Sequence, residues 1–164
     1  MLAVIEYVKI LQMMPHPEGG WYKEVYRSPG QISGEGDFPA GRNYATSIYF
    51  LIEAQNFSSF HRIQSDETWH FYSGDPLEVI EINENGILKS TIVGNDVLNG
   101  QVFQYTVPAG VWFASRVYKS GSFSLVGCTV SPGFDFRDFE LASRQSLKQQ
   151  FTDHAEIITE LTRF

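Results

Sequence analysis

The chain of 164 residues has little cysteine, little positive charge and no long apolar run, and each shortage excludes a class of protein. Its one cysteine, Cys128, has no partner within the chain, so a framework of intramolecular disulfides is excluded. Twelve Lys and Arg stand against 19 Asp and Glu, which gives a formal net charge of -7. Affinity for nucleic acid polymers or anionic membranes needs clustered cations. We therefore expect neither partner.

The apolar residues 2–14 do not have the pattern of a signal peptide or a membrane span. Glu6 and Lys9 interrupt the run, and no basic segment precedes it. The run is also shorter than the roughly 20 apolar residues that a membrane helix needs. Its apolar residues recur with helical spacing until Pro15. The sequence predicts an amphipathic helix over 2–14 and a cytoplasmic protein.

From residue 44 onward the chain is a series of short segments rich in aromatic and β-branched residues, with turn residues such as Asn85 and Gly86 between them. Strands at such close spacing are typical of an all-β sandwich or barrel. Beyond Gly133 the apolar spacing becomes helical. The length suits one domain, at a usual ~100 to 200 residues each. We predict a single domain, 1–164, with a barrel core at about 21–131 and a C-terminal helical segment at about 137–163.

Polar chemistry is concentrated in residues 61–74, which hold two of the four histidines, two carboxylates and an arginine. On one straight strand His61 and Glu67 would lie ~20 Å apart, at about 3.3 Å per residue. A joint role therefore requires a turn at 64–66. In the strand that follows, His70 points to the face opposite Glu67 unless a bulge intervenes.

Two spacings resemble the motifs of the cupin superfamily. His61-x-Ile63-x3-Glu67-x6-Gly74 resembles its first motif, and Pro108-Ala109-Gly110 resembles the Pro-x-Gly of its second. Over nearly its whole length the chain is similar to small cupins of unknown function called DUF985 or Cupin-5. The shared signatures are His16-Pro17-Glu18-Gly19-Gly20-Trp21-Tyr22, Arg27-Ser28, Ser47-Ile48-Tyr49-Phe50-Leu51, the 61–74 stretch and Pro132-Gly133-Phe134-Asp135-Phe136.

The resemblance implies an all-β fold, a double-stranded β-helix or cupin jelly-roll barrel, with a short N-terminal helix and C-terminal helices. Cupins of this size commonly pair, so it also implies a homodimer. Metal-binding cupins use two histidines and a glutamate from the first motif and a later histidine from the second. Here Ile63 and Phe113 occupy two of those positions. We predict no cofactor, with a divalent metal on His61 and Glu67 as the open alternative.

His61 and Glu67 also suit proton chemistry without a metal. A histidine titrates near neutral pH, and a carboxylate beside it orients the ring and stabilises its charged form. This resembles the metal-free cupin epimerases that act on deoxy-keto-sugar nucleotides, in which a histidine abstracts a proton next to a carbonyl. In such enzymes a tyrosine often protonates the opposite face. Tyr49, Tyr72 and Tyr118 are the candidates.

The residues around the pair predict a small-molecule ligand inside the barrel. Two tryptophans either form a stacking platform for a sugar or nucleobase ring or simply fill the barrel. The loop 15–20, with His16 and Glu18, is either a solvated turn or a lid across the barrel mouth. The predicted catalytic residues are His61 and Glu67, and the predicted ligand-binding residues are Ser47, Tyr49, Trp69, His70, Gln104 and Trp112.

Structural roles are the alternative for several of these residues. Glu67 could form an ion pair with Arg62 or Arg42, and Cys128 is predicted to be a small buried hydrophobe. Three functions stay open. The first is binding of a small polar, sugar- or nucleotide-like ring compound, with isomerase or epimerase activity that uses His61 as base. The second is a metal-dependent oxygenase or isomerase, and the third is ligand binding or sensing without catalysis.

Overall fold

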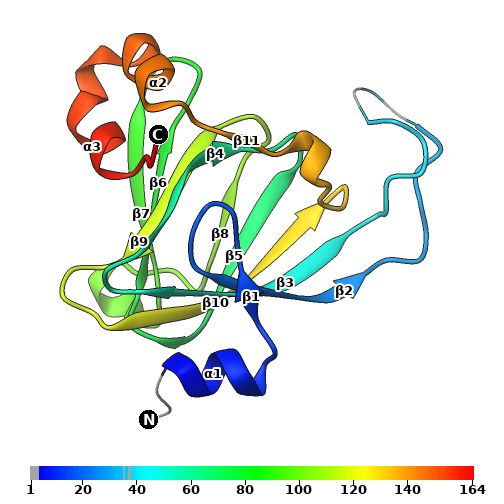
Figure 1. Ribbon diagram of the computed structural model, residues 1–164, viewed down its shortest axis with the longest axis horizontal. Coiled ribbons are helices and arrows are strands. Elements are labelled where there is room, and N and C mark those ends of the chain that lie inside the picture. Colours follow the sequence, from blue (N-terminus) through cyan, green and yellow to red (C-terminus); the bar gives the residue numbers. More distant parts are fainter. Residues whose placement is uncertain (1–3, 35, 37) are drawn as a thin grey trace.

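The computed structural model describes residues 4–34, 36 and 38–164 and consists of two antiparallel β-sheets with short helices near both ends of the chain (Figure 1). One sheet has the strand order β1 (Met14–Pro15), β2 (Trp21–Arg27), β3 (Thr46–Glu53), β10 (Phe123–Ser131), β5 (Asp66–Gly74) and β8 (Gln104–Val107). The other has the order β11 (Glu140–Leu141), β4 (Phe57–Arg62), β9 (Trp112–Val117), β6 (Leu77–Ile82) and β7 (Leu88–Val93). This confirms the predicted all-β jelly-roll barrel with terminal helices.

The core lies between the sheets because apolar side chains alternate along the strands. In β3, Phe50 and Ile52 are fully buried and pack with Val126 of β10 and Trp69 of β5. These side chains meet Val79 and other residues of the five-stranded sheet in one cluster. The inner faces of the two sheets therefore fill the barrel interior at one end, and the cavity lies at the other end.

The predicted turn between His61 and Glu67 is a corner between the two sheets. β4 ends at Arg62 in the five-stranded sheet and β5 begins at Asp66 in the six-stranded sheet. The Ser65 hydroxyl donates to the carbonyl of Pro132 at 2.6 Å, which ties this corner to the segment after β10. As predicted, the corner brings His61 and Glu67 to the same end of the barrel, where both line one cavity.

The helices cover the outer faces of the sheets. α1 (Val4–Ile10) is shorter than the predicted helix 2–14, whose first two residues lie outside the described residues, because Met14 and Pro15 pair with β2 instead. Its apolar side packs on Leu51 and on its neighbours in the six-stranded sheet. α2 (Arg144–Gln150) and α3 (Ala155–Glu160) cover the five-stranded sheet (Figure 1). The three 3-10 helices are η1 (Val97–Asn99), η2 (Phe136–Asp138) and η3 (Thr152–His154).

Within the described part of the chain, none of the helices has the length and apolar character needed to cross a membrane.

Candidate functional site

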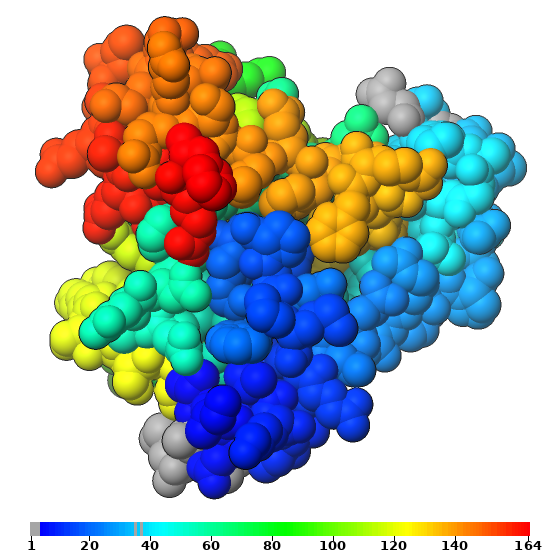
Figure 2. All heavy atoms as spheres, in the orientation of Figure 1, coloured from blue at the N-terminus to red at the C-terminus, as the bar shows by residue number. Residues whose placement is uncertain are grey.

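A cavity of about 430 Å³ opens at the end of the barrel where β2, β3, β5 and β10 meet the segment that follows β10. In the space-filling view, that orange segment lies directly against the blue segment that precedes β2 (Figure 2). The contact includes the rings of Phe136 and His16, which stack with centroids 5.9 Å apart. The cavity is lined by Met14, His16, Glu18, Tyr22, Lys23, Glu24, Arg27, Thr46, Ile48, Phe50, His61, Ile63, Glu67, Cys128, Val130, Phe134, Asp135, Phe136 and Phe139.

The loop 15–20 is a wall of this cavity and not a solvated turn. Its tight path depends on Gly19 and Gly20, whose φ angles are +116° and +74°. The carbonyl of Glu18 accepts a hydrogen bond from the backbone N–H of Ser59, so the loop is anchored to β4. As a result the Glu18 side chain turns inward and only 5% of the residue is exposed. Of the two alternatives for this loop, the structure favours the one in which it covers the barrel mouth.

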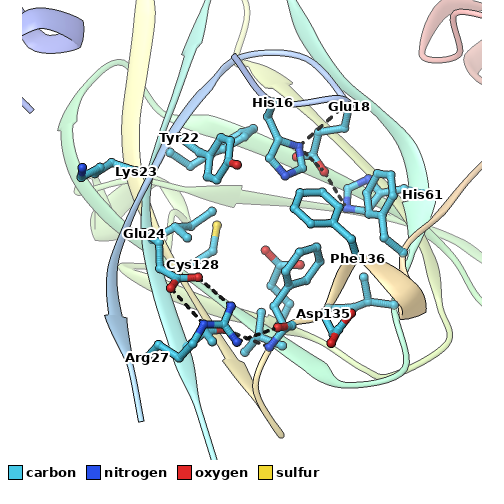
Figure 3. Close-up of a pocket in the computed structure, with 18 of the residues that line it drawn as sticks. His16, Glu18, Tyr22, Lys23, Glu24, Arg27, His61, Cys128, Asp135 and Phe136 are labelled. Carbon is cyan, nitrogen blue, oxygen red and sulfur yellow. Dashed lines mark hydrogen bonds and ion pairs between the residues drawn. The ribbon is translucent and has the colours of Figure 1, made fainter. Parts of the chain in front are cut away.

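His61 lies between a backbone carbonyl and the Glu18 carboxyl group (Figure 3). Its Nδ1 is 2.8 Å from the carbonyl oxygen of Ser59. Because a carbonyl only accepts, Nδ1 carries the hydrogen and Nε2 presents a lone pair in the neutral ring. Nε2 is 3.2 Å from Glu18 Oε2, and the Ser58 hydroxyl donates to Glu18 Oε1 at 2.8 Å. His61 and Glu18 therefore share a proton.

His16 extends this chain of groups. Its Nδ1 is 3.4 Å from Glu18 Oε2 and accepts the backbone N–H of Glu18 at 3.4 Å, so its hydrogen lies on Nε2. The ring packs edge-on against Tyr22 with centroids 4.7 Å apart. His16 and His61 thus both lie within 3.4 Å of the same oxygen, Glu18 Oε2.

Burial favours the neutral form of each of these groups. It lowers the pKa of His61, although Glu67 and the Ser59 carbonyl oppose that change. It also lowers the pKa of His16, against the effect of Glu18. Burial raises the pKa of Glu18, with His16 and the Ser58 hydroxyl acting in the opposite direction. Burial thus opposes ionisation of both His61 and Glu18.

Glu67 is a buried carboxyl group in the lining of the cavity. Burial raises the pKa of its carboxyl group to about 7, His61 lowers it, and Glu18 raises it. The two arginines that could pair with it have other partners, since Arg62 pairs with Glu140 and Arg42 with Asp138. No ion pair among the described residues includes Glu67. The ion-pair alternative for Glu67 is therefore wrong.

Cys128 is buried, as predicted, but it is more than a filler of the core. Its thiol lines the cavity and hydrogen-bonds the Glu67 carboxylate, which lowers the pKa of Glu67. Burial and the nearby Glu67 raise the pKa of the Cys128 thiol well above its usual value, so it stays protonated. Cys128 therefore acts as a hydrogen-bond donor to Glu67.

Four of the predicted ligand-binding residues lie on the opposite face of the six-stranded sheet. Gln104, His70 and Tyr49 stand in one row across the sheet, with Gly127 between His70 and Tyr49. Ser47 lies on the same outer face, because Ile48 between it and Tyr49 lines the cavity. His70 bonds the Thr129 hydroxyl there at 3.0 Å, so the bulge in β5 does not turn it inward. The structure corrects these four assignments.

The stacking platform predicted from two tryptophans is also corrected. Trp69 faces inward, as expected, but it is fully buried against Phe50 and Phe113, below the cavity. Trp112 lies on the other face of its sheet, in the cluster covered by α2 and α3. The Arg62 guanidinium stacks over its ring at 4.5 Å. The tryptophans fill the fold, and neither lines the cavity.

Several residues that the sequence reasoning did not assign to the site are central to it. Glu18 takes the place beside His61 that was assigned to Glu67, and Phe134, Phe136 and Phe139 cover the cavity from the segment after β10. The sequence does hold a signal for these residues, since the shared signatures 16–22 and 132–136 contain most of them. The residues come together only because loops from distant parts of the chain pack against each other.

The residues present do not fit the metal site of the metal-binding cupins. Among the described residues, no group of three or more His, Cys, Asp or Glu side chains is arranged to hold a metal ion. Ile63 contributes an apolar side chain to the cavity, and Phe113 packs on the His61 ring with centroids 4.1 Å apart. Both ring nitrogens of His61 already have partners within the protein. Among the described residues, the site therefore lacks the ligand set of such a metal centre.

Comparison with known proteins gives a family and relatives. The family model described as "Cupin superfamily (DUF985)" matches residues 5–142. The chain is 33% identical over 139 residues to the uncharacterized protein YML079W of Saccharomyces cerevisiae, across 77% of this chain and 69% of that protein.

Solved structures resemble the whole chain. A hypothetical protein from Leishmania major has a TM-score of 0.92 at 36% identity, covering 99% of this chain and 100% of its own. Protein SO0799 from Shewanella oneidensis has a TM-score of 0.89 at 38% identity, covering 99% of each chain. A mutant of Bacillus subtilis oxalate decarboxylase has a TM-score of 0.56 at 13% identity, covering 91% of this chain and 37% of its own. That last likeness concerns the fold alone.

Proposed function

The chain belongs to the DUF985 family of the cupin superfamily, and on this premise we propose that its cavity binds a small polar ring compound and moves a proton on it, as an isomerase or epimerase does. The single observation that carries the proposal is the buried pair of Glu18 and His61, 3.2 Å apart, at the wall of a 430 Å³ cavity. Ligand pockets have volumes of about 300 to 1,000 Å³. A buried acid–base pair in such a pocket is typical of proton-transfer sites.

The proposed step starts at a C–H bond next to a carbonyl group of the ligand. Glu18 takes the proton while its own proton passes to Nε2 of His61, and the electrons of the C–H bond move into the carbonyl as an enolate. Glu67 and the Ser59 carbonyl stabilise the imidazolium that forms, since both raise the pKa of His61. The proton then returns to carbon by the same route, and no oxidant or reductant is consumed.

In this step the base is His61, as the sequence predicted, but it acts through Glu18 and does not touch the ligand directly. Glu67 supplies the carboxylate that supports the charged ring. Binding without turnover is the second candidate function, and the observation that favours it is that both nitrogens of His61 have partners within the protein. Both candidate functions use the same cavity, but only the isomerase or epimerase would exchange a proton of the ligand with solvent.

Solvent deuterium exchange tests the proposed function. A panel of cyclic ketones and keto sugars is incubated with the protein in D₂O, and loss of the α-proton signal is followed by NMR. We expect exchange in at least one compound, and His61→Asn to slow it about a hundredfold while leaving its affinity nearly unchanged. His70→Asn, on the outer face of the sheet, is the matched control and leaves the rate unchanged. Saturable binding of a panel member without exchange would assign the non-catalytic role.

Removal of divalent metal is expected to leave the protein unaffected. Because the ring nitrogens of His61 bond Ser59 and Glu18, and Ile63 and Phe113 cannot ligate, EDTA should not change the melting temperature or the exchange rate. Elemental analysis before and after chelation accompanies the melting curves. About one metal ion per chain, lost together with several degrees of melting temperature, would contradict this expectation and restore the metal-dependent alternative.

The homodimer and the cytoplasmic location stay predictions. Native mass spectrometry of the purified protein measures the oligomer directly, and a mass of twice 18.6 kDa is expected. A predominant single-chain mass at micromolar concentration would contradict the homodimer.

A further inference from the structure

The charges around the cavity are unevenly compensated. The Glu24 carboxylate is neutralised by Arg27, whose guanidinium donates two hydrogen bonds to it, of 3.0 and 2.7 Å. Asp135 pairs with Arg137 at 2.7 Å. The Glu67 carboxylate, only 8% exposed, has the thiol of Cys128 as a hydrogen-bond donor but takes part in no ion pair among the described residues. When it is ionised, the interior of the cavity therefore carries a negative charge without a counter-charge.

Among the described residues, the lining holds one lysine and one arginine, Lys23 and Arg27, and neither is placed to neutralise an anionic ligand. The Arg27 guanidinium uses Nε and Nη2 for Glu24 and Nη1 for the Asn43 side chain and the Phe134 carbonyl. Figure 3 shows the amine of Lys23 directed away from the other side chains of the cavity. A phosphate or carboxylate group would thus be desolvated next to Glu67 with nothing to neutralise it, which is costly.

Aromatic rings make up much of the remaining lining. Phe134, Phe136 and Phe139 form a cluster with centroid distances of 5.0 to 6.4 Å, and Tyr22 faces it across His16. The faces of aromatic rings attract cations, most strongly where water is excluded. A buried carboxylate together with several rings is the ordinary protein environment of an ammonium group.

We propose that the ring compound bound in this cavity is a cation, an amine or another protonated nitrogen base, whose charge is met by Glu67 and the aromatic rings. This inference rests on the proposed function, because it names the ligand class of the same cavity. It replaces the nucleotide-like class with ring compounds that carry a positive charge and no phosphate. The cation is organic, since the lining lacks the ligand set of a metal site among the described residues.

Three probes of one shape and three charges test the inference. Benzylamine, benzyl alcohol and benzoate share a ring and differ in carrying a positive, zero and negative charge. Their affinities are measured above pH 7, where Glu67 is ionised, and changes in the imidazole NMR signals of His16 and His61 place them in the cavity. We expect benzylamine to bind about tenfold more tightly than benzyl alcohol, and benzoate to bind most weakly.

Two isosteric variants assign the preference to one carboxylate. Glu67→Gln is expected to remove the advantage of benzylamine over benzyl alcohol. Glu78→Gln is the control, because it takes the same charge from the net total at a carboxylate that pairs with Arg116 outside the cavity. An equal or higher affinity for benzyl alcohol or benzoate, or a preference that survives in Glu67→Gln, overturns the inference while the cavity remains a ring-binding site. Failure of all three probes to bind would count against the proposed function as well.

Discussion

The Glu67→Gln variant is expected to be more stable than the unaltered protein above pH 7, by about 3.5 kcal/mol in the free energy of unfolding. Near pH 4.5 the two proteins should be almost equally stable. The reason is that glutamine keeps the shape of the carboxyl group but never has to carry a charge inside the cavity. Urea unfolding of both proteins at pH values on either side of this window measures the difference.

The direction of the pH dependence follows from the proton count. The pKa of the Glu67 carboxyl is 4.5 in the unfolded chain and about 7 in the folded protein. Between these values the folded protein holds a proton that the unfolded chain has lost, so stability falls as the pH rises through the window. The interval of about 2.5 pH units, at about 1.4 kcal/mol each, gives the figure of about 3.5 kcal/mol. A stability difference that does not vary with pH would contradict this account.

Of the other titratable groups near Glu67, His61 is one whose titration the substitution also changes, because Glu67 raises its pKa. Burial lowers the pKa of His61, so its contribution to stability is lost as the pH falls below 6.5, in the direction opposite to that of Glu67. The Cys128 thiol stays protonated throughout, because burial raises its pKa well above the usual value. Glu18 is present in both proteins, and burial raises its pKa as well.

A carboxylate that lowers stability is more typical of a functional site than of a structural one. Among the described residues Glu67 takes part in no ion pair, whereas Arg27, Arg42 and Arg62 each pair with another carboxylate. A positively charged ligand would remove the free-energy cost of ionising Glu67 inside the cavity.

Binding of benzylamine should therefore lower the pKa of Glu67, and it should stabilise the protein more above pH 7 than at pH 5.

The pattern of short strands was enough to predict an all-β sandwich or barrel, and the resemblance to cupins implied the jelly-roll arrangement. The short aromatic and β-branched runs became strands, and the turn after Arg62 became the corner between the sheets. The alternation of side chains along a strand could have corrected part of the site. In β3, Ile48 and Phe50 face the cavity, which places Ser47 and Tyr49 on the outer face, although their polar side chains are of a type that suits ligand binding.

The partner of His61 could not be derived from spacing. Glu67 was the expected neighbour because both residues belong to one motif, whereas Glu18 is 43 positions before His61 and enters from a loop without regular structure. The position of Glu18 is set by the hydrogen bond from the Ser59 backbone N–H to the Glu18 carbonyl and by the two glycines that follow Glu18. Contacts between a loop and a distant strand depend on tertiary geometry, which local sequence patterns do not encode.

The dependence of the site on this loop leads to the largest expected loss of stability, in Gly19→Ala. Gly19 has a φ of +116°, which residues with a side chain rarely adopt, and a Cβ atom there would overlap the carbonyl oxygen of Phe57 and the guanidinium of Arg163. Backbone strain and overpacking cost about 1 to 3 kcal/mol each. Since Phe57 belongs to a strand and cannot move freely, we expect a loss of about 4 kcal/mol in the free energy of unfolding.

Gly100→Ala is the matched control for the left-handed backbone alone. Gly100 has a φ of +82° and no heavy atom within 4 Å of an added Cβ, so its replacement should cost only about 1 kcal/mol. Denaturant unfolding of both variants separates the two effects, and the imidazole signals of His16 and His61 report on the site. In Gly19→Ala the loop must leave its place against Ser59, which withdraws Glu18 from His61 and abolishes benzylamine binding. If the two variants lose equal stability, or if the His61 signal is unchanged in Gly19→Ala, the loop does not hold the site together. Glu18 could then reach His61 without the contact between Gly19 and Phe57.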